Sequence, residues 1–217
     1  MDLLEALRTT GSCRSFTDEP VGDDVVASIL DDARFAPSGG NRQPWRVAVV
    51  KDTATRRTLA DLMSDVWQEY LAQGEEPGRA PFAFGRSLGD GRRVAAPNPL
   101  LDRIEDVPVV LAVAADLARI ALMDADIGRQ PMTGGASVYP FCWSILLAAR
   151  ARGLGGVLTT FLSRAEPNAA PLLGLPEGHA LVASIFIGHP VHLNTKLKRQ
   201  SVSSFATVDR FDGPSLT

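Results

Sequence analysis

The chain has 217 residues, which suits one domain over 1–217 with a single substantial core. With 22 Lys and Arg against 25 Asp and Glu the net charge is −3, which rules out the broadly basic surface of a protein that binds nucleic acid or acidic lipid. The two cysteines, Cys13 and Cys142, have neither the number nor the spacing of a disulfide framework or a zinc site, so we expect a cytoplasmic protein without a metal.

The first 50 residues predict two helices and a strand. The opening segment MDLLEALRTT lacks the long apolar run of a signal peptide, and Asp2 suits the cap of a short helix with leucines on one face. A second helix is expected to begin at Asp23 and Asp24, whose charges suit a helix N-terminus, and to end at Pro37. The apolar run RVAVV at 46–50 then predicts a strand.

A long helical stripe of apolar residues follows this strand. Its members are Leu59, Leu62, Met63, Val66, Trp67 and Tyr70, and such a stripe is more typical of a core or a subunit contact than of a cofactor site. From Gly74 to about Asp106 the pattern is lost among Gly, Pro and Arg residues. Structureless stretches of this length are unusual inside a compact domain, so we expect residues 75–106 to form a lid, a binding loop or a disordered segment.

The second half of the chain predicts three strands and a buried helix. VPVVLAVAAD at 107–116 has no polar face and predicts a buried strand, and the apolar segment 136–152 predicts the central helix, with Pro140 tolerated only near its first turn. GGVLTT at 155–160 and HALVASIFIG at 179–188 predict the remaining strands. All apolar runs fall well short of the roughly 20 residues that a membrane helix needs, so no membrane association is expected.

The connection between the last two strands predicts one more short helix. Ser163 and Glu166 have the spacing of a capping box at its start. Strands thus alternate with helices along the whole chain, and no linker-like change of composition interrupts them. From this pattern alone we expect one layered domain of the α/β type.

Hydrolytic and dinucleotide-binding motifs are missing from the sequence. There is no GxSxG elbow, the three histidines cluster late in the chain without a nucleophile, and Cys142 lies in the most apolar helix, where an inert buried thiol is expected. GLGG at 153–156 follows a helix and opens a strand, the reverse of the dinucleotide fingerprint. A bound phosphate would therefore be held by scattered residues.

Two segments offer groups that suit a phosphate monoester. GSCRSF supplies Ser12 and Arg14, and NTKLKRQ supplies Lys196, Lys198 and Arg199. Guanidinium, ammonium and hydroxyl groups are the donors that a phosphate prefers. Either segment alone would be more typical of a solvated charge run, so both interpretations stay open at this point.

Several motifs, taken in order, resemble the flavin-dependent nitroreductase family. They are SCRSF followed by PV, then APSGGNRQPW, the helix ending LLAARARGLGG, a strand leading to GHP, and a basic tail ending in VDRF. The resemblance covers nearly the whole chain and implies an α+β fold with a three-layer α/β/α arrangement around a central, mostly antiparallel mixed sheet. It also implies a homodimer with FMN at the subunit interface and residues 190–217 as an arm that embraces the partner.

The resemblance further implies which residues contact the FMN. Ser12 and Arg14 would contact the phosphate and the ribityl end, Lys198 and Arg199 would close on the phosphate, and Lys196 is a looser match. The partner subunit would line the flavin with Pro37, Ser38, Gly39 and Asn41, while the Gln43 amide would reach the polar edge of the ring or brace its own loop. Leu158, Thr159 and Thr160 would pass beside the isoalloxazine, where a backbone N–H can meet the flavin N5.

The chain departs from the family pattern at three places, one of which is Ser15, where a basic residue is frequent. Thr10 and Gly11 stand where many members carry a basic pair, which removes positive charge from the expected phosphate site. Trp143 and Ser144 stand where a Gln-Asn pair is common.

In a flavin enzyme the cofactor carries the redox chemistry, so the absence of a catalytic triad is expected. The resemblance implies hydride transfer from NADH or NADPH through flavin N5 to nitroaromatic, quinone or related small acceptors by a ping-pong mechanism. Alternatives are a flavin-sequestering protein with little turnover, a flavin-fragmenting benzimidazole synthase and a small-molecule dehydrogenase.

Overall fold

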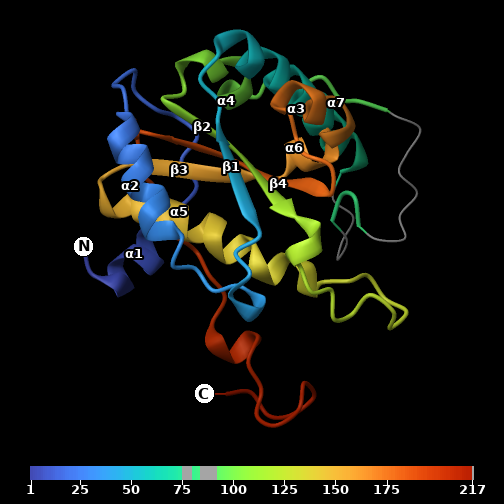
Figure 1. Ribbon diagram of the computed structural model, residues 1–217. Helices are drawn as coiled ribbons and strands as arrows, with labels where there is room; N and C mark the ends of the chain where they lie inside the picture. Colours follow the sequence, from blue (N-terminus) through green and yellow to red (C-terminus); the bar gives the residue numbers. More distant parts are fainter. Residues whose placement is uncertain (75–79, 84–91, 217) are drawn as a thin grey trace.

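In a computed structural model that describes residues 1–74, 80–83 and 92–216, the chain builds a four-stranded sheet of order β1-β2-β4-β3 (Figure 1). The strands are β1 (Trp45–Val49), β2 (Val109–Asp116), β3 (Gly155–Thr159) and β4 (His179–Gly188). All three pairings are antiparallel, which agrees with the antiparallel sheet that the family resemblance implies. The parallel contribution among the described residues is one isolated bridge between Ser12 and Gly156.

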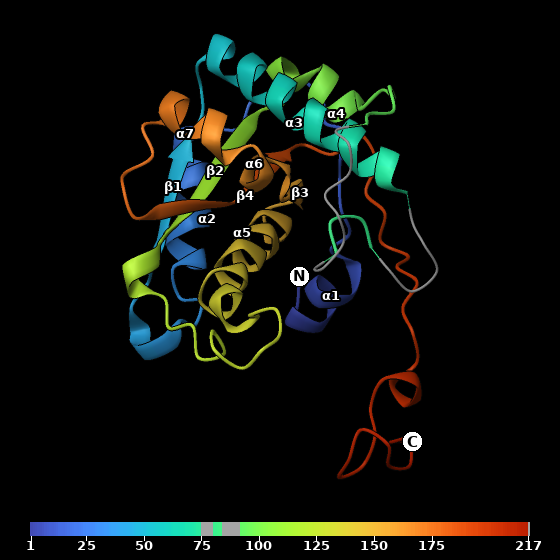
Figure 2. The same ribbon diagram turned by 90° about the vertical axis from the view of Figure 1, so that its right-hand side faces the viewer.

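Helices pack against both faces of this sheet (Figure 2). They are α1 (Leu3–Thr9), α2 (Asp23–Ala33), α3 (Thr53–Gln73), α4 (Pro99–Asp102), α5 (Tyr139–Ala151), α6 (Phe161–Arg164) and α7 (Glu166–Leu173). α2 and α5 cover one face, and α3, α4, α6 and α7 cover the other. No helix of the described residues is both long and apolar enough to cross a membrane.

β2 is buried on both faces, which explains why its sequence shows no polar alternation. Because successive side chains of a strand point to opposite faces, Val109, Leu111 and Val113 join the core under α2 and α5. The intervening Val110 and Ala112 join the core under α3. The prediction of a buried strand at this position is therefore confirmed.

β4 changes face halfway along its length. Its register with β2 shifts between Val113 and Ala114, whose partners are Ala183 and Leu181, so Val182 is an extra residue in β4. An inserted residue reverses the inside-outside alternation of a strand. Leu181 consequently packs in the core beneath α3, whereas Ala183 packs in the opposite core.

Part of the segment expected to be structureless is helical. α4 and the 3₁₀ turn Ile104–Asp106 bury Leu100, Leu101 and Ile104, so the expectation of irregular structure up to Asp106 is wrong for residues 99–106. These apolar side chains complete the core beneath α3. The rest of the expected lid falls partly on 75–79 and 84–91, which lie outside the described residues.

Two expected helix starts differ from the structure. α5 begins at Tyr139 rather than Ala136, because a 3₁₀ turn, Thr133–Ser137, precedes it, and Pro140 lies in its first turn as predicted. The capping box does not form. Its expected Glu166 instead accepts a hydrogen bond from the Leu181 main-chain N–H at 2.5 Å.

The C-terminal segment leaves the body of the protein after β4 and extends away from the sheet (Figures 1 and 2).

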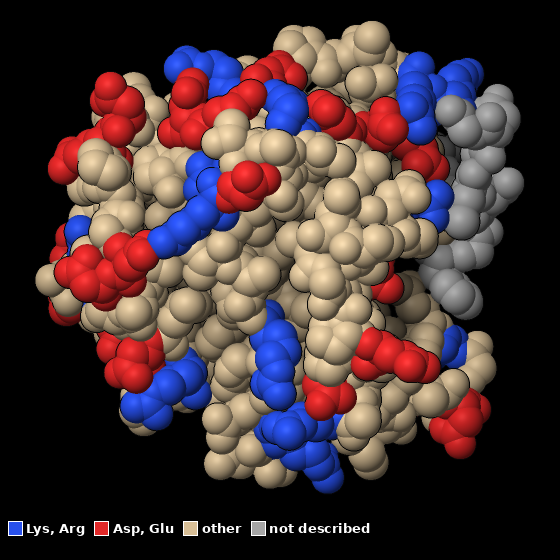
Figure 3. Space-filling model, turned by 45° about the horizontal axis from the view of Figure 1, so that its top comes forward, with Lys and Arg blue, Asp and Glu red and all other residues tan. Residues whose placement is uncertain are grey.

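The upper face of the molecule carries interspersed acidic and basic side chains (Figure 3), in line with the near balance of charges in the sequence.

Candidate active site

Residues 11–16, which follow α1 and are called the Ser12 segment below, run along the edge strand β3. The Cys13 main-chain N–H donates to the Gly156 carbonyl at 2.9 Å, and the tail joins the same edge because the Val191 N–H donates to the Ser15 carbonyl at 3.1 Å. A Cβ on Gly155 would lie 2.8 Å from the Cys13 Cβ, and a Cβ on Gly156 would lie 2.8 Å from Leu146 Cδ2. The glycines of GLGG thus permit close packing of three segments.

This packing places Arg14 in the lining of a cavity of about 490 Å³. The residues around it come from the Ser12 segment, α3, α4 and the end of β3: Arg14, Trp67, Tyr70, Pro97, Asn98, Pro99, Leu100, Leu101, Leu158, Thr159, Thr160 and Phe161. The structure therefore brings together Arg14 and the Leu158–Thr160 segment, two parts of the site that the sequence expectations kept separate. The volume falls within the range of about 300–1,000 Å³ typical of small-molecule sites.

Two polar atoms of this cavity lining are buried without a hydrogen-bond partner. They are Nε1 of Trp67 and Oγ1 of Thr159. Buried polar groups in folded proteins are nearly always hydrogen-bonded, so such orphans indicate a missing ligand or water. The exposed Arg14 guanidinium likewise has no carboxylate partner within the described part of the chain. The cavity therefore offers donors suited to an acceptor-rich molecule.

Aromatic rings form the wall of the cavity on the α3 side. The Trp67 and Tyr70 rings stack with centroids 6.0 Å apart, and Phe161 meets both of them edge-on at 5.9 and 6.3 Å. Of the apolar stripe expected on α3, Met63 lies in the core as predicted, whereas Trp67 and Tyr70 line the cavity. The sequence alone could not separate the cavity-lining residues from the core residues, because both occur at the same helical spacing of apolar side chains.

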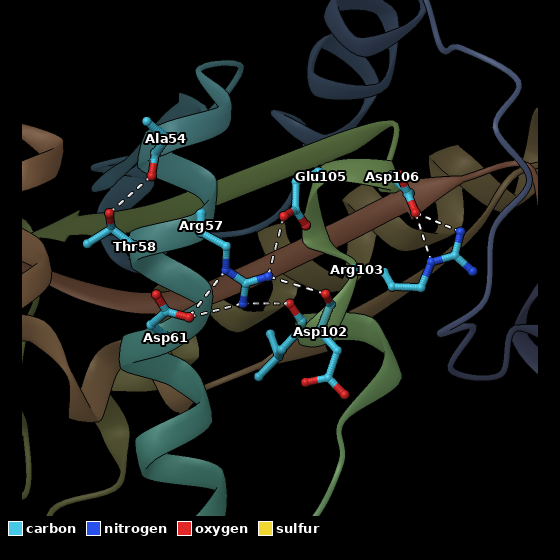
Figure 4. A network of polar contacts seen from close by, with 9 residues as sticks. Ala54, Arg57, Thr58, Asp61, Asp102, Arg103, Glu105 and Asp106 are labelled. Atoms are coloured by element: carbon cyan, nitrogen blue, oxygen red, sulfur yellow. Dashed lines mark hydrogen bonds and ion pairs between the residues drawn. The ribbon is translucent and has the colours of Figure 1, made fainter.

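α4 is fixed against α3 by one arginine (Figure 4). Arg57 donates to the main-chain carbonyls of Leu101 and Asp102, both at 3.2 Å, and pairs with Asp61 at 3.1 Å and Glu105 at 3.5 Å. Because α4 supplies part of the cavity wall, this network positions the wall from outside the cavity. Nothing in the sequence distinguished Arg57 from any other surface arginine.

The loop APSGGNRQPW lies elsewhere on the molecule. The Gly39 N–H donates to Ser137 Oγ at 3.0 Å, and the Gln43 N–H donates to Ser38 Oγ at 3.0 Å. The Gln43 side-chain amide donates to the Asn41 side-chain oxygen at 3.0 Å, so it braces its own loop. None of the predicted loop residues, which are Pro37, Ser38, Gly39, Asn41 and Gln43, lines the cavity that holds Arg14.

The loop has a strained backbone and a firm anchor. Asn41 and Gln43 adopt φ values of 52° and 47°, in the left-handed region that side chains other than glycine rarely occupy. At its end the Trp45 ring stacks on Phe141, with centroids 4.6 Å apart and an interplanar angle of 2°. Strained backbone that the surrounding structure maintains is typical of binding loops.

The tail approaches the Ser12 segment before it leaves the body. A Cβ on Gly11 would lie 2.7 Å from the Asn194 carbonyl oxygen and 2.9 Å from Leu197 Cδ2. Glycine is therefore required at this crossing, which gives a structural reason for the absence of a basic side chain at position 11. Lys198 and Arg199 follow directly and are exposed.

Cys142 is fully buried in α5, and burial raises the pKa of its thiol to about 12. The predicted burial of this thiol is confirmed, and the raised pKa favours an unreactive side chain because the thiolate is the reactive species.

Comparison with known proteins identifies the family. The model of the nitroreductase family matches residues 7–189. The 5,6-dimethylbenzimidazole synthase of Rhodospirillum rubrum is 33% identical over 82% of this chain and 76% of its own, and the nitrobenzene nitroreductase of Ectopseudomonas oleovorans is 28% identical over 85% of each chain. The crystal structure of a nitroreductase with bound FMN from Desulfitobacterium hafniense superposes with a TM-score of 0.59, at 25% identity, over 91% of this chain and 93% of that one. The chain belongs to the nitroreductase family.

Proposed function

We propose that the protein is an FMN-dependent NAD(P)H oxidoreductase. The observation that carries the proposal is the cavity in which Arg14 and the Leu158–Thr160 segment meet, with two orphaned polar atoms in its lining. A flavin ring is planar and has carbonyl and imine acceptors along one edge, so these donors and the aromatic wall fit it. The relatives that bind FMN or reduce nitro compounds support the same assignment.

The residues of the cavity would bind and orient the cofactor. Arg14 would place its positive charge beside the polar edge of the ring, where it stabilises negative charge that develops during reduction. Thr159 Oγ1 and Trp67 Nε1 would each gain the hydrogen bond that they lack in its absence. When bound, FMN would supply hydride transfer at N5 from NADH or NADPH to nitroaromatic, quinone or related small acceptors, with the two reactants using the site in turn.

We also propose that the protein acts as a homodimer. The loop residues Ser38, Gly39 and Asn41 do not line the cavity of their own chain, so a second copy would have to supply them to the flavin. Exposed apolar side chains on α1, on α5 and in the C-terminal segment offer a dimer surface: Leu3, Leu4, Leu7, Tyr139, Trp143, Val202, Phe205 and Phe211. In this arrangement residues 190–217 form an arm on the partner, and light scattering after size exclusion measures the mass directly. A monomer would contradict this role for the loop.

The similarity to the R. rubrum synthase supports a second candidate function, fragmentation of the flavin itself to dimethylbenzimidazole. The two functions make different products from a mixture that contains FMN, NAD(P)H, oxygen and a nitroaromatic acceptor. Incubation of the enzyme with excess FMN, NAD(P)H and a nitroaromatic in air, followed by mass spectrometry, distinguishes them. Accumulation of the benzimidazole would establish the synthase, whereas intact FMN and a reduced nitroaromatic would establish the reductase.

Anaerobic stopped-flow reduction by NADH and by NADPH tests the main proposal. We expect at least one donor to bleach the flavin absorbance and a quinone or nitroaromatic to restore it. A protein that binds FMN but is bleached by neither donor would contradict the oxidoreductase and favour flavin storage. A colourless protein that does not take up added FMN would contradict every flavin-based function.

A further inference from the structure

Three segments of the chain meet beside Gly11. The N-terminal segment passes through Thr9 and Gly11, the tail passes Gly11 at Asn194 and Leu197, and the last turn of α5 reaches Thr9 through Arg150. Neither position 10 nor position 11 supplies a basic side chain. At this meeting point α5 contributes Arg150, and the tail carries Lys196 and Lys198 close in sequence to Leu197.

Arg150 has almost no partners of its own. Its Nη2 donates to Thr9 Oγ1 at 3.5 Å, the limit of a hydrogen bond, and its Nε is buried without any partner. No carboxylate of residues 1–74, 80–83 and 92–216 forms an ion pair with Arg150, Lys196 or Lys198. The side chain of Arg150 is partly buried, so it has lost hydration without gaining an opposite charge.

Comparison with the neighbouring Arg152 shows that the lack of partners is specific to position 150. Two residues further on, at the C-cap of α5, Arg152 pairs with Asp32 at 2.7 Å and donates to Ser28 Oγ at 2.5 Å and to the Ala148 carbonyl at 3.0 Å. The end of α5 thus carries one arginine with several partners, Arg152, and one with a single long hydrogen bond, Arg150. Arg150 is the arginine that reaches Thr9, the last residue of α1, shortly before Ser12 in the chain.

We propose that Arg150 is a ligand of the FMN phosphate and supplies the charge that Thr10 and Gly11 do not. The inference rests on the proposed function and extends it to the phosphate end of the site. Arg14 lines the cavity assigned to the ring, so it is placed to serve the ring rather than the phosphate. A phosphate monoester carries nearly two negative charges, and a guanidinium binds it through two parallel hydrogen bonds. Ser12 and Lys198 would complete the phosphate site.

Titration of the flavin-free protein with FMN and with riboflavin, which lacks the phosphate, tests this assignment. We expect Arg150→Gln to weaken FMN binding by about 10- to 150-fold, the effect of one charge-assisted hydrogen bond, and to leave riboflavin binding within about twofold. Arg152→Gln is the matched control, because it removes the same charge at the same helix end, and it should change the two affinities equally or not at all. Arg150→Lys keeps the charge without the planar fork and should weaken FMN binding less than Arg150→Gln.

The outcomes separate the phosphate assignment from the proposed function. Wild-type protein that binds neither flavin would contradict both. Wild-type protein that binds FMN, together with an Arg150→Gln variant that binds FMN equally well, would overturn the role of Arg150 alone. Equal weakening of FMN and riboflavin would show that Arg150 only supports the helix end. If Arg150→Gln does not fold, the FMN-to-riboflavin affinity ratio of Arg150→Lys decides, and an unchanged ratio overturns the assignment.

Discussion

Replacement of Thr159 by valine should stabilise the flavin-free protein and weaken its binding of FMN. Thr159 lies at the end of β3 with its Oγ1 buried and unpartnered, and valine has nearly the same shape and an equal preference for strands. A buried hydroxyl without a hydrogen bond costs about 1–3 kcal/mol, and the new methyl group adds about 0.8 kcal/mol of apolar burial. Because Thr159 borders a cavity, we expect the free energy of unfolding to rise by only about 1–2 kcal/mol, which is less than the sum of these two contributions.

The binding effect has the opposite sign. If Oγ1 hydrogen-bonds to the flavin, its loss should cost about 0.5–1.5 kcal/mol, which weakens FMN affinity by about 2- to 13-fold. Urea unfolding of the flavin-free variant measures the first effect, and fluorescence titration with FMN measures the second. Ser163→Ala is a matched control, because Ser163 Oγ is also buried and unpartnered but does not line the Arg14 cavity. It should stabilise the protein without changing FMN affinity.

Thr160→Val provides a second control, since Thr160 lines the same cavity but is exposed. It should have little effect on the free energy of unfolding. A Thr159→Val variant that is less stable than wild type would refute the reasoning, because it would show that Oγ1 has a partner in the flavin-free protein. Greater stability with unchanged FMN affinity would place the flavin away from Thr159.

Three further predictions concern the scaffold. Arg56→Met should lower the free energy of unfolding by about 2–3 kcal/mol in urea denaturation, because the buried guanidinium donates to the carbonyls of Val50 and Val107 at 2.8 and 2.7 Å; an unchanged midpoint would contradict this role. The hydroxyl of Thr133 and nearby main-chain N–H groups hold the pKa of Asp124 well below its usual range. The stability advantage of wild type over Asp124→Asn should therefore be complete above the unfolded-state pKa of about 3.9 and should shrink as the pH falls below that value. Thermal unfolding of both proteins across this pH range measures the difference, and a difference that does not change with pH would contradict the reasoning. Cys142 should not react with a thiol reagent at neutral pH until the protein unfolds, and rapid labelling of the native protein would contradict its burial.

The sequence predicted most elements because their determinants are local. β4 begins and ends where its apolar run does, and α1 starts at the Asp2 cap. Alternation, capping and composition could not reveal the extra residue Val182, since the register of β4 depends on its pairing with β2. The capping box at Ser163 failed for the same reason, because a strand N–H distant in sequence, that of Leu181, binds Glu166 instead.

Short motifs and their order in the sequence were enough to predict the family and to name most of the expected site residues. Which of these residues share a cavity was decided only by the tertiary structure. Packing of the Ser12 segment against Gly155 and Gly156 brings Arg14 into the same cavity as Thr159. α3 and α4 also line this cavity, and α3 contributes Trp67 with its unpartnered indole N–H. Hydrogen-bond satisfaction is a property of the assembled fold, so an unpartnered donor has no signature in sequence, whereas periodicity and turn chemistry do.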